Sequence, residues 1–410
     1  MEERHIVSID LGSSKFRICA ARVTEDNVQV IYYKETPSAG IRAGVVQDST
    51  KVSAFLKKAI EEVENELKVR IMQAVVGLPR SDVKLVTTSA SVIRSRPDEY
   101  ITKEEVGNLW SKALESYPLD DEMSQIMYGA EPQSFSVDGF FTDDPEGCFG
   151  KELEGNFTVV IGRRRDTSAV DTVFNSLGIA IAMKYFSPSL VAKTILSEED
   201  RQNGIALVDV GAGVTSVAVY HDGFIRSYAS FPFGGKTISD EIQSLCSVPK
   251  ELAEKILRHF GSSQPVTPDT MREDILKTIS QKCYKELTVQ YISKVIDAQC
   301  RVIIDSVLNH IQESGFKHNL GNGIVLTGGG ASLMNIASLF KEMSGYDVRI
   351  GLPKQPFSSC VGTGVYSPSA TLAIAMILAA KDWIFFDCIT CPKPELADDS
   401  DNSDFSFPSV

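Results

Sequence analysis

The first part of the chain alternates between short apolar runs and polar turns. Ile6–Ile9, Phe16–Val23 and Val28–Tyr33 have the length and the β-branched content of strands. They predict a β-hairpin or a meander of neighbouring strands. A similar pattern returns at Ile205–Gly223, where an apolar run, an aspartate, a glycine-containing bend and a second apolar run follow in the same order. The repetition predicts a chain built from two related halves.

Longer stretches carry apolar residues three and four positions apart, which is the spacing of one helix face. Ser49–Lys68 is such a stretch, and Ser49 is its expected N-cap. Asp274–Ser314 and the alanine-rich Ser369–Lys381 are predicted as further helices, whereas the charged Ser197–Gly204 is predicted as a connector.

The pattern changes between about residues 80 and 162. Val83–Arg96 alternates like a half-buried strand, and Thr102–Glu105 has the pattern of a capping box at a helix start. An acidic loop, Thr142–Gly150, separates two later strand-like runs. This segment predicts a small α+β unit with its own core. It holds no cluster of catalytic residue types, so its expected role is contact with another molecule.

Composition narrows the classes of function. The 54 acidic residues outnumber the 41 basic ones, and a net charge of −13 argues against a nucleic-acid-binding protein. The eight cysteines form no disulfide framework and the charged start Met1–His5 is no signal peptide, so we expect a cytoplasmic protein. Cys388 and Cys391 are predicted to be two ordinary thiols. No apolar run reaches the roughly 18 residues of a membrane span.

The two repeated bends carry the candidate chemistry. Asp10–Lys15 and the corresponding bend after Asp209 are rich in glycine and small residues, which lets backbone N–H groups approach an anion. Each aspartate can hold a hydrated Mg²⁺ against phosphate oxygens. The turn Thr327–Gly330 suits close approach to a ribose or purine, and Gly234–Gly235 suits either an anion site or an ordinary loop. Together they predict two bends that clamp a nucleoside triphosphate across a cleft.

The order of these motifs resembles the superfamily of actin, sugar kinases and heat-shock chaperone ATPases. Within it, Ile9–Lys15, Gly40–Asp48, Leu196–Tyr228 and Gly323–Leu333 resemble motifs of the FtsA family of bacterial cell division proteins, and the resemblance extends to about Lys381. The inserted unit follows Gly77-Leu-Pro79, where that family carries its extra subdomain.

The resemblance implies an α/β, actin-like fold, in which two related βαβ-type domains flank a nucleotide cleft and a small α+β subdomain is inserted. The expected division assigns 1–80, 163–203 and 360–386 to the first domain, 81–162 to the insertion, 204–359 to the second domain with a helical subdomain at 238–301, and 387–410 to a disordered acidic tail.

The resemblance also implies a role for each motif residue, with ATP and Mg²⁺ as ligands. Asp10 and Asp209 are expected near Mg²⁺, holding it through water. The phosphates would lie against Gly12, Ser13, Ser14, Lys15, Gly211, Gly213 and Thr215, and the ribose and base against Gly234, Gly235, Gly328, Gly329 and Gly330.

The family's role is to polymerise head to tail, to bind the C-terminal tail of FtsZ and to tether it at the inner face of the cell membrane at the division site. The partners implied are therefore FtsZ, further copies of this chain, and the membrane surface or a membrane-bound division protein, with no nucleic acid. The family's basic amphipathic C-terminal helix has no counterpart in the ending SDNSDFSFPSV. We expect attachment through a partner or through a segment outside this chain.

Departures from the family pattern bear on catalysis. Ala212 and Val214 replace small or hydroxyl residues of the second bend, and Leu257 stands where the family has a lysine near the base. No general base is evident and no catalytic residue is assigned, so any ATPase activity should be slow. Two alternatives stay open: a small-molecule kinase of the same superfamily, and an actin-fold scaffold of pilus assembly.

Overall fold

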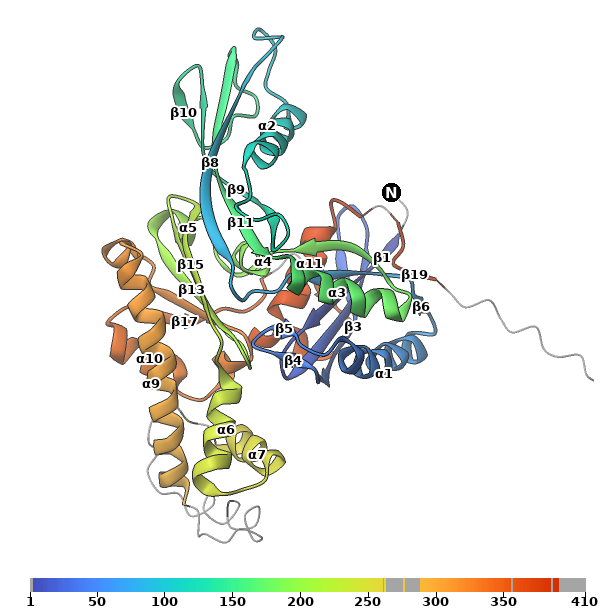
Figure 1. Cartoon of the computed structure of the whole chain (residues 1–410), viewed down its shortest axis with the longest axis vertical. Coiled ribbons are helices and arrows are strands. Elements are labelled where there is room, and N and C mark those ends of the chain that lie inside the picture. Colours follow the sequence, from blue (N-terminus) through green and yellow to red (C-terminus); the bar gives the residue numbers. More distant parts are fainter. Residues whose placement is uncertain are drawn as a thin grey trace, which may run out of the picture.

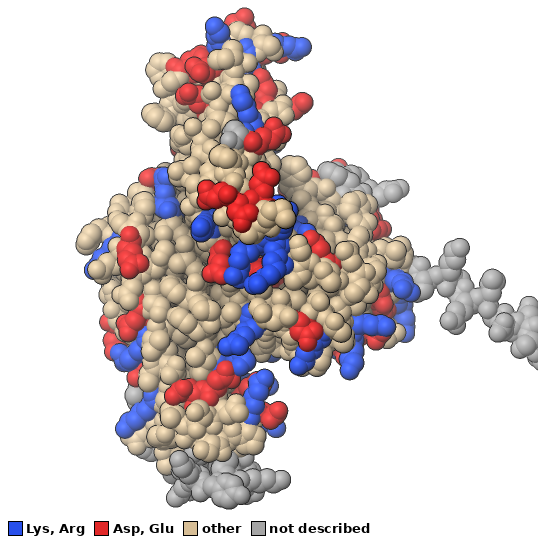
Figure 2. Space-filling view, in the orientation of Figure 1, with Lys and Arg blue, Asp and Glu red and all other residues tan. Residues whose placement is uncertain are grey.

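The computed structural model of the chain describes residues 3–260, 262, 276, 288–354, 357–384 and 386–390. Figure 1 shows two halves side by side, each made of a sheet with helices, and a narrower unit that extends from them at one end. Among the described residues, no helix combines the length and apolarity needed to cross a bilayer. Acidic and basic side chains are mixed over the face drawn in Figure 2, with a group of basic ones near its middle.

The first half is built on a six-stranded sheet in the order β12-β7-β1-β2-β3-β18. Most residues of β1 and β2 are buried on both faces, because α1 and α3 pack together on the sheet and α4 packs with α11 on it as well. The predicted meander is confirmed as β1 (Arg4–Leu11), β2 (Lys15–Val23) and β3 (Val28–Pro37). The other elements are β4 (Ile41–Arg42), β5 (Val45–Val46), α1 (Ser49–Leu67), β6 (Arg70–Ile71), β7 (Gln73–Gly77), α3 (Arg164–Leu177), β12 (Ala180–Tyr185), α4 (Ser187–Ile195), β18 (Ser358–Ser359), α11 (Thr371–Ala380) and β19 (Ile389–Thr390).

The second half repeats this arrangement with a sheet in the order β15-β14-β13-β16-β17. In each half, three strands form an antiparallel meander, and two parallel strands extend the sheet beyond the first strand of that meander. The shared strand order confirms the two related halves that the repeated motif predicts. The strands are β13 (Ile205–Val210), β14 (Thr215–His221), β15 (Phe224–Phe231), β16 (Ile324–Thr327) and β17 (Val348–Ile350), and α5 (Glu198–Asn203) and α10 (Ile336–Ser344) accompany them.

Three helices extend the second half away from its sheet: α6 (Gly235–Cys246), α7 (Lys250–Phe260) and α9 (Val289–Glu313). They contact one another, and α9 also packs on β14. The predicted long helix is present from Val289 onward. Its first part, residues 274–287, lies outside the described residues apart from Leu276.

The inserted unit is a four-stranded sheet with α2 on one face, in the strand order β10-β9-β11-β8. It has its own core of buried residues, among them Leu109 and Phe157. Thr102 and Glu105 form the predicted capping box at the start of α2. The elements are β8 (Lys84–Ile93), α2 (Lys103–Ser116), β9 (Gln125–Val137), β10 (Phe140–Thr142) and β11 (Glu152–Arg163).

Three local predictions differ from the structure. The N-cap of α1 is Asp48, whose carboxylate accepts a hydrogen bond from the Lys51 N–H, so Ser49 is the first residue of the helix. The charged segment predicted as a connector contains α5, because Ser197 and Asp200 form a capping box. The predicted disordered tail begins with an ordered strand, since β19 pairs with β6, and residues 391–410 lie outside the described residues.

Candidate functional site

The two bends have the same backbone construction. In the first hairpin Asp10 lies opposite Arg17, and in the second Asp209 lies opposite Ser216. In each, the glycine two residues after the aspartate packs against a carbonyl oxygen three residues further on. A Cβ at Gly12 would lie 2.5 Å from the carbonyl oxygen of Lys15. A Cβ at Gly211 would lie 2.7 Å from that of Val214. Only glycine fits either position without a shift of the backbone.

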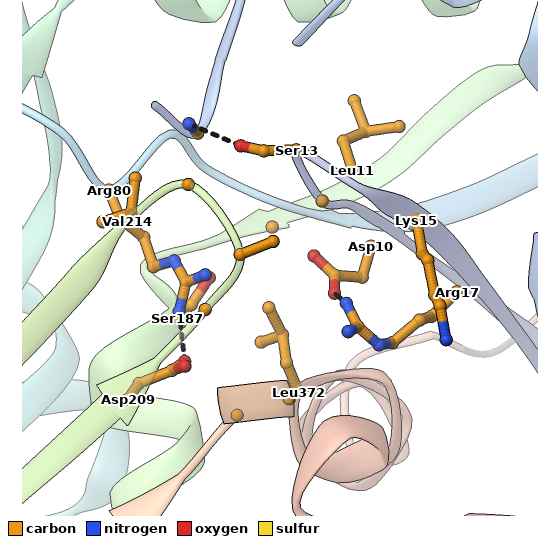
Figure 3. A pocket seen from close by; sticks show the side chains of 18 of the residues that line it. Asp10, Leu11, Ser13, Lys15, Arg17, Arg80, Ser187, Asp209, Val214 and Leu372 are labelled. Carbon is orange, nitrogen blue, oxygen red and sulfur yellow. Dashed lines mark hydrogen bonds and ion pairs between the residues drawn. The ribbon is translucent and has the colours of Figure 1, made fainter. Parts of the chain in front are cut away.

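The two bends also contact each other at the junction of the halves, as Figure 3 shows. A Cβ at Gly213 would lie 2.6 Å from Ser13 Oγ, so the second bend packs directly on the first. Ser13 Oγ in turn accepts a hydrogen bond of 2.9 Å from the Gly44 N–H, which fixes its orientation. The expected cleft is therefore narrow at this point.

The cleft around the bends is lined by ten of the predicted site residues. They are Asp10, Gly12, Ser13, Ser14, Lys15, Asp209, Gly211, Gly213, Gly328 and Gly329.

The cleft continues into a wider cavity between the bends, the glycine turn and helices α6, α7 and α9. Gly235 and Gly330 lie here with Gly329, next to apolar side chains such as Ile303 and Phe340. Lys236, Lys250 and Arg258 add basic groups to the described residues of its wall. The narrow end thus holds the charged side chains beside the two bends, and the wide end has an apolar floor, which is an arrangement that suits a phosphorylated ligand with a flat aromatic part.

Two predicted residues, Thr215 and Gly234, do not line the cleft. Thr215 is the residue that corresponds to the buried Phe16 of the first hairpin, so its side chain points into the sheet's packing, and its hydroxyl donates to the Phe233 carbonyl at 2.9 Å. Gly234 packs on the second bend, where a Cβ would lie 2.3 Å from the Gly211 carbonyl oxygen.

The first N–H groups of α6 are already bonded. Gly235 N donates to the Gly211 carbonyl at 2.9 Å and Lys236 N donates to the Ala212 carbonyl at 2.8 Å. This helix start therefore fixes the shape of the second bend, and these two donors are not directed at an anion.

The glycine turn after β16 lies against Asp209. Gly328 has a φ of +80°, and a Cβ there would lie 2.2 Å from Asp209 Oδ1. The next α-helix, α10, begins only at Ile336, because a 3₁₀ turn, η2 (Gly329–Ser332), intervenes. The turn thus contributes backbone to the cleft and no α-helix N-terminus.

Arg17 and Glu35 connect the first bend to β3. Arg17 Nη1 lies 2.9 Å from Asp10 Oδ2, and its Nε lies 3.1 Å from Glu35 Oε1. Lys15 also contacts Glu35. Burial alone would raise the pKa of Glu35, but Arg17 and Lys15 lower it to about 2. Burial likewise would lower the pKa of Arg17, yet Asp10 and Glu35 hold it above its ordinary value.

Asp209 has its partner in the other half. Arg80, which follows β7, contacts Asp209 Oδ2, and the Tyr228 hydroxyl donates to the Arg80 carbonyl at 2.9 Å. Burial would lower the pKa of Arg80, but Asp209 and Asp10 raise it. The Arg80–Asp209 pair spans the cleft between the halves, as the dashed line in Figure 3 shows.

In this arrangement the two aspartates do not fit a magnesium ion. Each carboxylate has an oxygen bonded to a guanidinium, which carries the positive charge that a metal would bring. The part of the chain that the structure describes contains no group of three or more His, Cys, Asp or Glu side chains placed to hold a metal. A hydrated Mg²⁺ beside either aspartate would first have to displace an arginine.

Sequence reasoning missed Arg17, Arg80 and Glu35 as cleft residues. A signal for Arg17 was present, because a tight hairpin around Gly12 places Arg17 opposite Asp10. Arg80 gave no local signal, since only the meeting of the two halves brings it to Asp209.

Comparisons with known proteins agree with this architecture. The family model described as Cell division protein FtsA matches residues 206–375. The cell division protein FtsA of Enterococcus hirae is 26% identical over 373 residues, which are 90% of this chain and 82% of that protein.

Two solved structures share the fold. The PilM-PilN type IV pilus biogenesis complex matches with a TM-score of 0.60 and 15% identity, covering 92% of this chain and 98% of the other. MreB 5 of Spiroplasma citri bound to AMPPNP matches with a TM-score of 0.52 and 14% identity, covering 93% and 97%. The chain therefore has an actin-like fold, and its sequence is similar to the FtsA family of cell division proteins.

Proposed function

We propose that the cleft binds ATP, with the phosphates between the two bends and the base in the wider cavity. The observation that carries this proposal is the contact of Ser13 with Gly213, which brings two equivalent glycine bends face to face where the two halves meet. The fold neighbour MreB 5 has been solved with the ATP analogue AMPPNP. The apolar floor near Ile303 and Phe340 suits the base.

ATP acts in this proposal mainly as a ligand that favours one arrangement of the halves. Asp10 and Asp209 are the carboxylates of the narrow cleft among the described residues, and each is bonded to an arginine. Neither is therefore placed as a free general base for hydrolysis. Binding would shift the population toward the closed form, and turnover would be slow.

The biological role proposed is that of an FtsA-type scaffold in cell division. It would assemble head to tail with further copies of itself, bind the C-terminal tail of FtsZ, and hold it at the inner face of the cell membrane, directly or through a membrane-bound division protein. The sequence relationship to FtsA over 90% of the chain supports this role.

Sedimentation and electron microscopy with and without ATP, in solution and on lipid monolayers, test the assembly. Filaments that require ATP are the expected result. Gly213→Ala, which would push the bends apart, should abolish them, whereas Gly107→Ala should not, because nothing lies within 4 Å of a Cβ at Gly107. Absence of filaments in every condition would overturn the assembly proposal.

A pilus-assembly scaffold is the second candidate, since the PilM-PilN complex has the highest TM-score of the two structures described above. A binding assay with the FtsZ C-terminal tail separates the two candidates. Saturable binding at micromolar concentration supports the division role, and its absence favours the pilus-type scaffold.

A further inference from the structure

Basic side chains outnumber acidic ones in the narrow cleft, so its negative charge is already neutralised without a metal. Asp10 and Asp209 supply its negative charge, and Lys15, Arg17 and Arg80 supply its positive charge. Of these basic groups, the two arginines contact the two aspartates directly. A magnesium ion placed beside either aspartate would meet a guanidinium at short range, and the repulsion between the two cations opposes its binding.

Both arginines are held firmly in place. The side chain of Arg17 is 16% exposed and is bonded to Asp10 and to Glu35 at once, so moving it would break two ion pairs. The side chain of Arg80 is 18% exposed, and its own carbonyl is fixed by the hydroxyl of Tyr228. Displacing either one would leave a partly buried carboxylate without its partner, which is costly unless the incoming ion replaces every lost contact.

Each guanidinium also keeps donors for a further acceptor. Arg17 uses Nη1 and Nε in its ion pairs, and Arg80 uses Nη1. Among the described residues, Nη2 of neither arginine makes a hydrogen bond, and each Nη2 lies beside a glycine of the cleft. A Cβ at Gly329 would lie 3.7 Å from Arg17 Nη2, and one at Gly211 would lie 3.6 Å from Arg80 Nη2. A phosphate oxygen between the bends would find a donor on either side, in the planar geometry that guanidinium offers to phosphate.

We infer that the cleft binds the triphosphate of its nucleotide without a divalent metal, with Arg17 and Arg80 in the place of Mg²⁺ as the counter-charge. This inference rests on the proposed nucleotide binding and changes its chemistry. Asp10 and Asp209 then serve as positioning residues that orient the two guanidiniums, and do not act as ligands of a metal.

Equilibrium binding of a fluorescent ATP analogue to the full chain, in Mg²⁺ and in excess EDTA, tests the inference. For the wild type, we expect the two dissociation constants to agree within about threefold. Arg17→Gln and Arg80→Gln should each weaken binding in EDTA by about tenfold or more, because a charged hydrogen bond to phosphate is lost. Arg22→Gln is the matched control, since Arg22 lies on the same strand as Arg17 but pairs with Glu3 at the surface.

The double variant Arg17→Gln/Arg80→Gln gives the sharpest result. The two substitutions leave both aspartates without an arginine partner. This variant should therefore bind the ATP analogue more tightly in Mg²⁺ than in EDTA, and recover part of the affinity that it has lost. Mg²⁺ alone should also raise the melting temperature of this variant but not that of the wild type, because only the variant offers unpaired carboxylates to the ion. That readout needs no nucleotide, and it shows at the same time that the variant is folded.

The outcomes separate this inference from the proposed function. Wild-type binding that falls more than about tenfold in EDTA would overturn the inference and leave nucleotide binding intact. No binding of the analogue in either condition would overturn both. Equal binding in the two conditions, with unchanged affinity in both arginine variants, would show that the arginines do not contact the phosphates and would overturn the inference alone.

Discussion

Arg80 reaches Asp209 across the cleft, from the end of β7 in one half to the end of β13 in the other. The first bend needs no such partner, because Arg17 lies opposite Asp10 within the same hairpin. The corresponding position of the second hairpin is Ser216, which cannot neutralise an aspartate. The two hairpins therefore differ in charge at this position, and the ion pair of Asp209 with Arg80 links the two halves.

Arg80→Gln should lower the free energy of unfolding by about 3 kcal/mol, because it leaves Asp209 partly buried without its charge partner. The Asp209 side chain is 14% exposed, so solvent screens this loss only weakly. Urea unfolding followed by circular dichroism measures the change. Arg96→Gln is the control, since Arg96 and Glu99 form an exposed pair worth less than about 1 kcal/mol. Equal losses in the two variants would contradict a structural role for the Arg80–Asp209 pair.

Glu35 predicts a pH dependence of stability. Its folded pKa of about 2 lies below the ordinary value of 4.5, so its contribution is present above pH 4.5 and is lost as the pH falls toward 2. A shift of this size corresponds to at most about 3 kcal/mol. The difference in unfolding free energy between the wild type and Glu35→Gln should therefore shrink as the pH is lowered through this window. A difference that stays constant from pH 7 to pH 3 would contradict the prediction.

Much of the architecture could be predicted from the sequence because it depends on local pattern. The repeated apolar runs around Asp10 and Asp209 give the matching meanders, and the capping box at Thr102 marks the start of α2. The motifs also place most of the glycines around one cleft. These features involve neighbouring residues in sequence, whose spacing determines their geometry.

The rest depends on contacts between distant segments. The Arg80–Asp209 pair joins residues 129 positions apart, and no periodicity signals it. Thr215 has the right residue type for a phosphate site, but the strand alternation turns its side chain toward Phe233. Gly235 occupies a helix start, yet its N–H is taken by the Gly211 carbonyl. In each case the three-dimensional partner decides the role that the residue type alone left open.

Arg94 should hold the inserted subdomain together. Its side chain is 2% exposed and donates to Glu105 at 2.9 Å and to the carbonyls of Gly150 at 2.7 Å and Glu99 at 3.0 Å. Arg94→Gln would leave these acceptors without a charged donor, and we expect a local loss of about 3 kcal/mol. Hydrogen exchange should become faster in β8 and β11 and stay unchanged in β1 and β13. Faster exchange throughout the chain would contradict an independent core for this subdomain, and unchanged exchange would contradict the role of Arg94.

The contact of Ser13 with Gly213 predicts how closely the two halves must approach. Gly213→Ala would place a methyl group 2.6 Å from Ser13 Oγ and 2.8 Å from its Cβ, so the bends must separate. We expect weaker binding of the ATP analogue, by about tenfold, because the two bends can no longer contact one phosphate chain together.

Ser13→Gly in the same chain removes both clashing atoms, and it should restore part of the affinity that Gly213→Ala loses. Ser13→Gly alone measures the separate cost of losing the hydrogen bond from Gly44. A double-mutant cycle over the four proteins isolates the contact itself. If the losses of affinity in the two single variants simply add up in the double variant, the bends act independently in binding. A double variant that binds the analogue more tightly than this sum predicts shows that the ligand requires their direct contact.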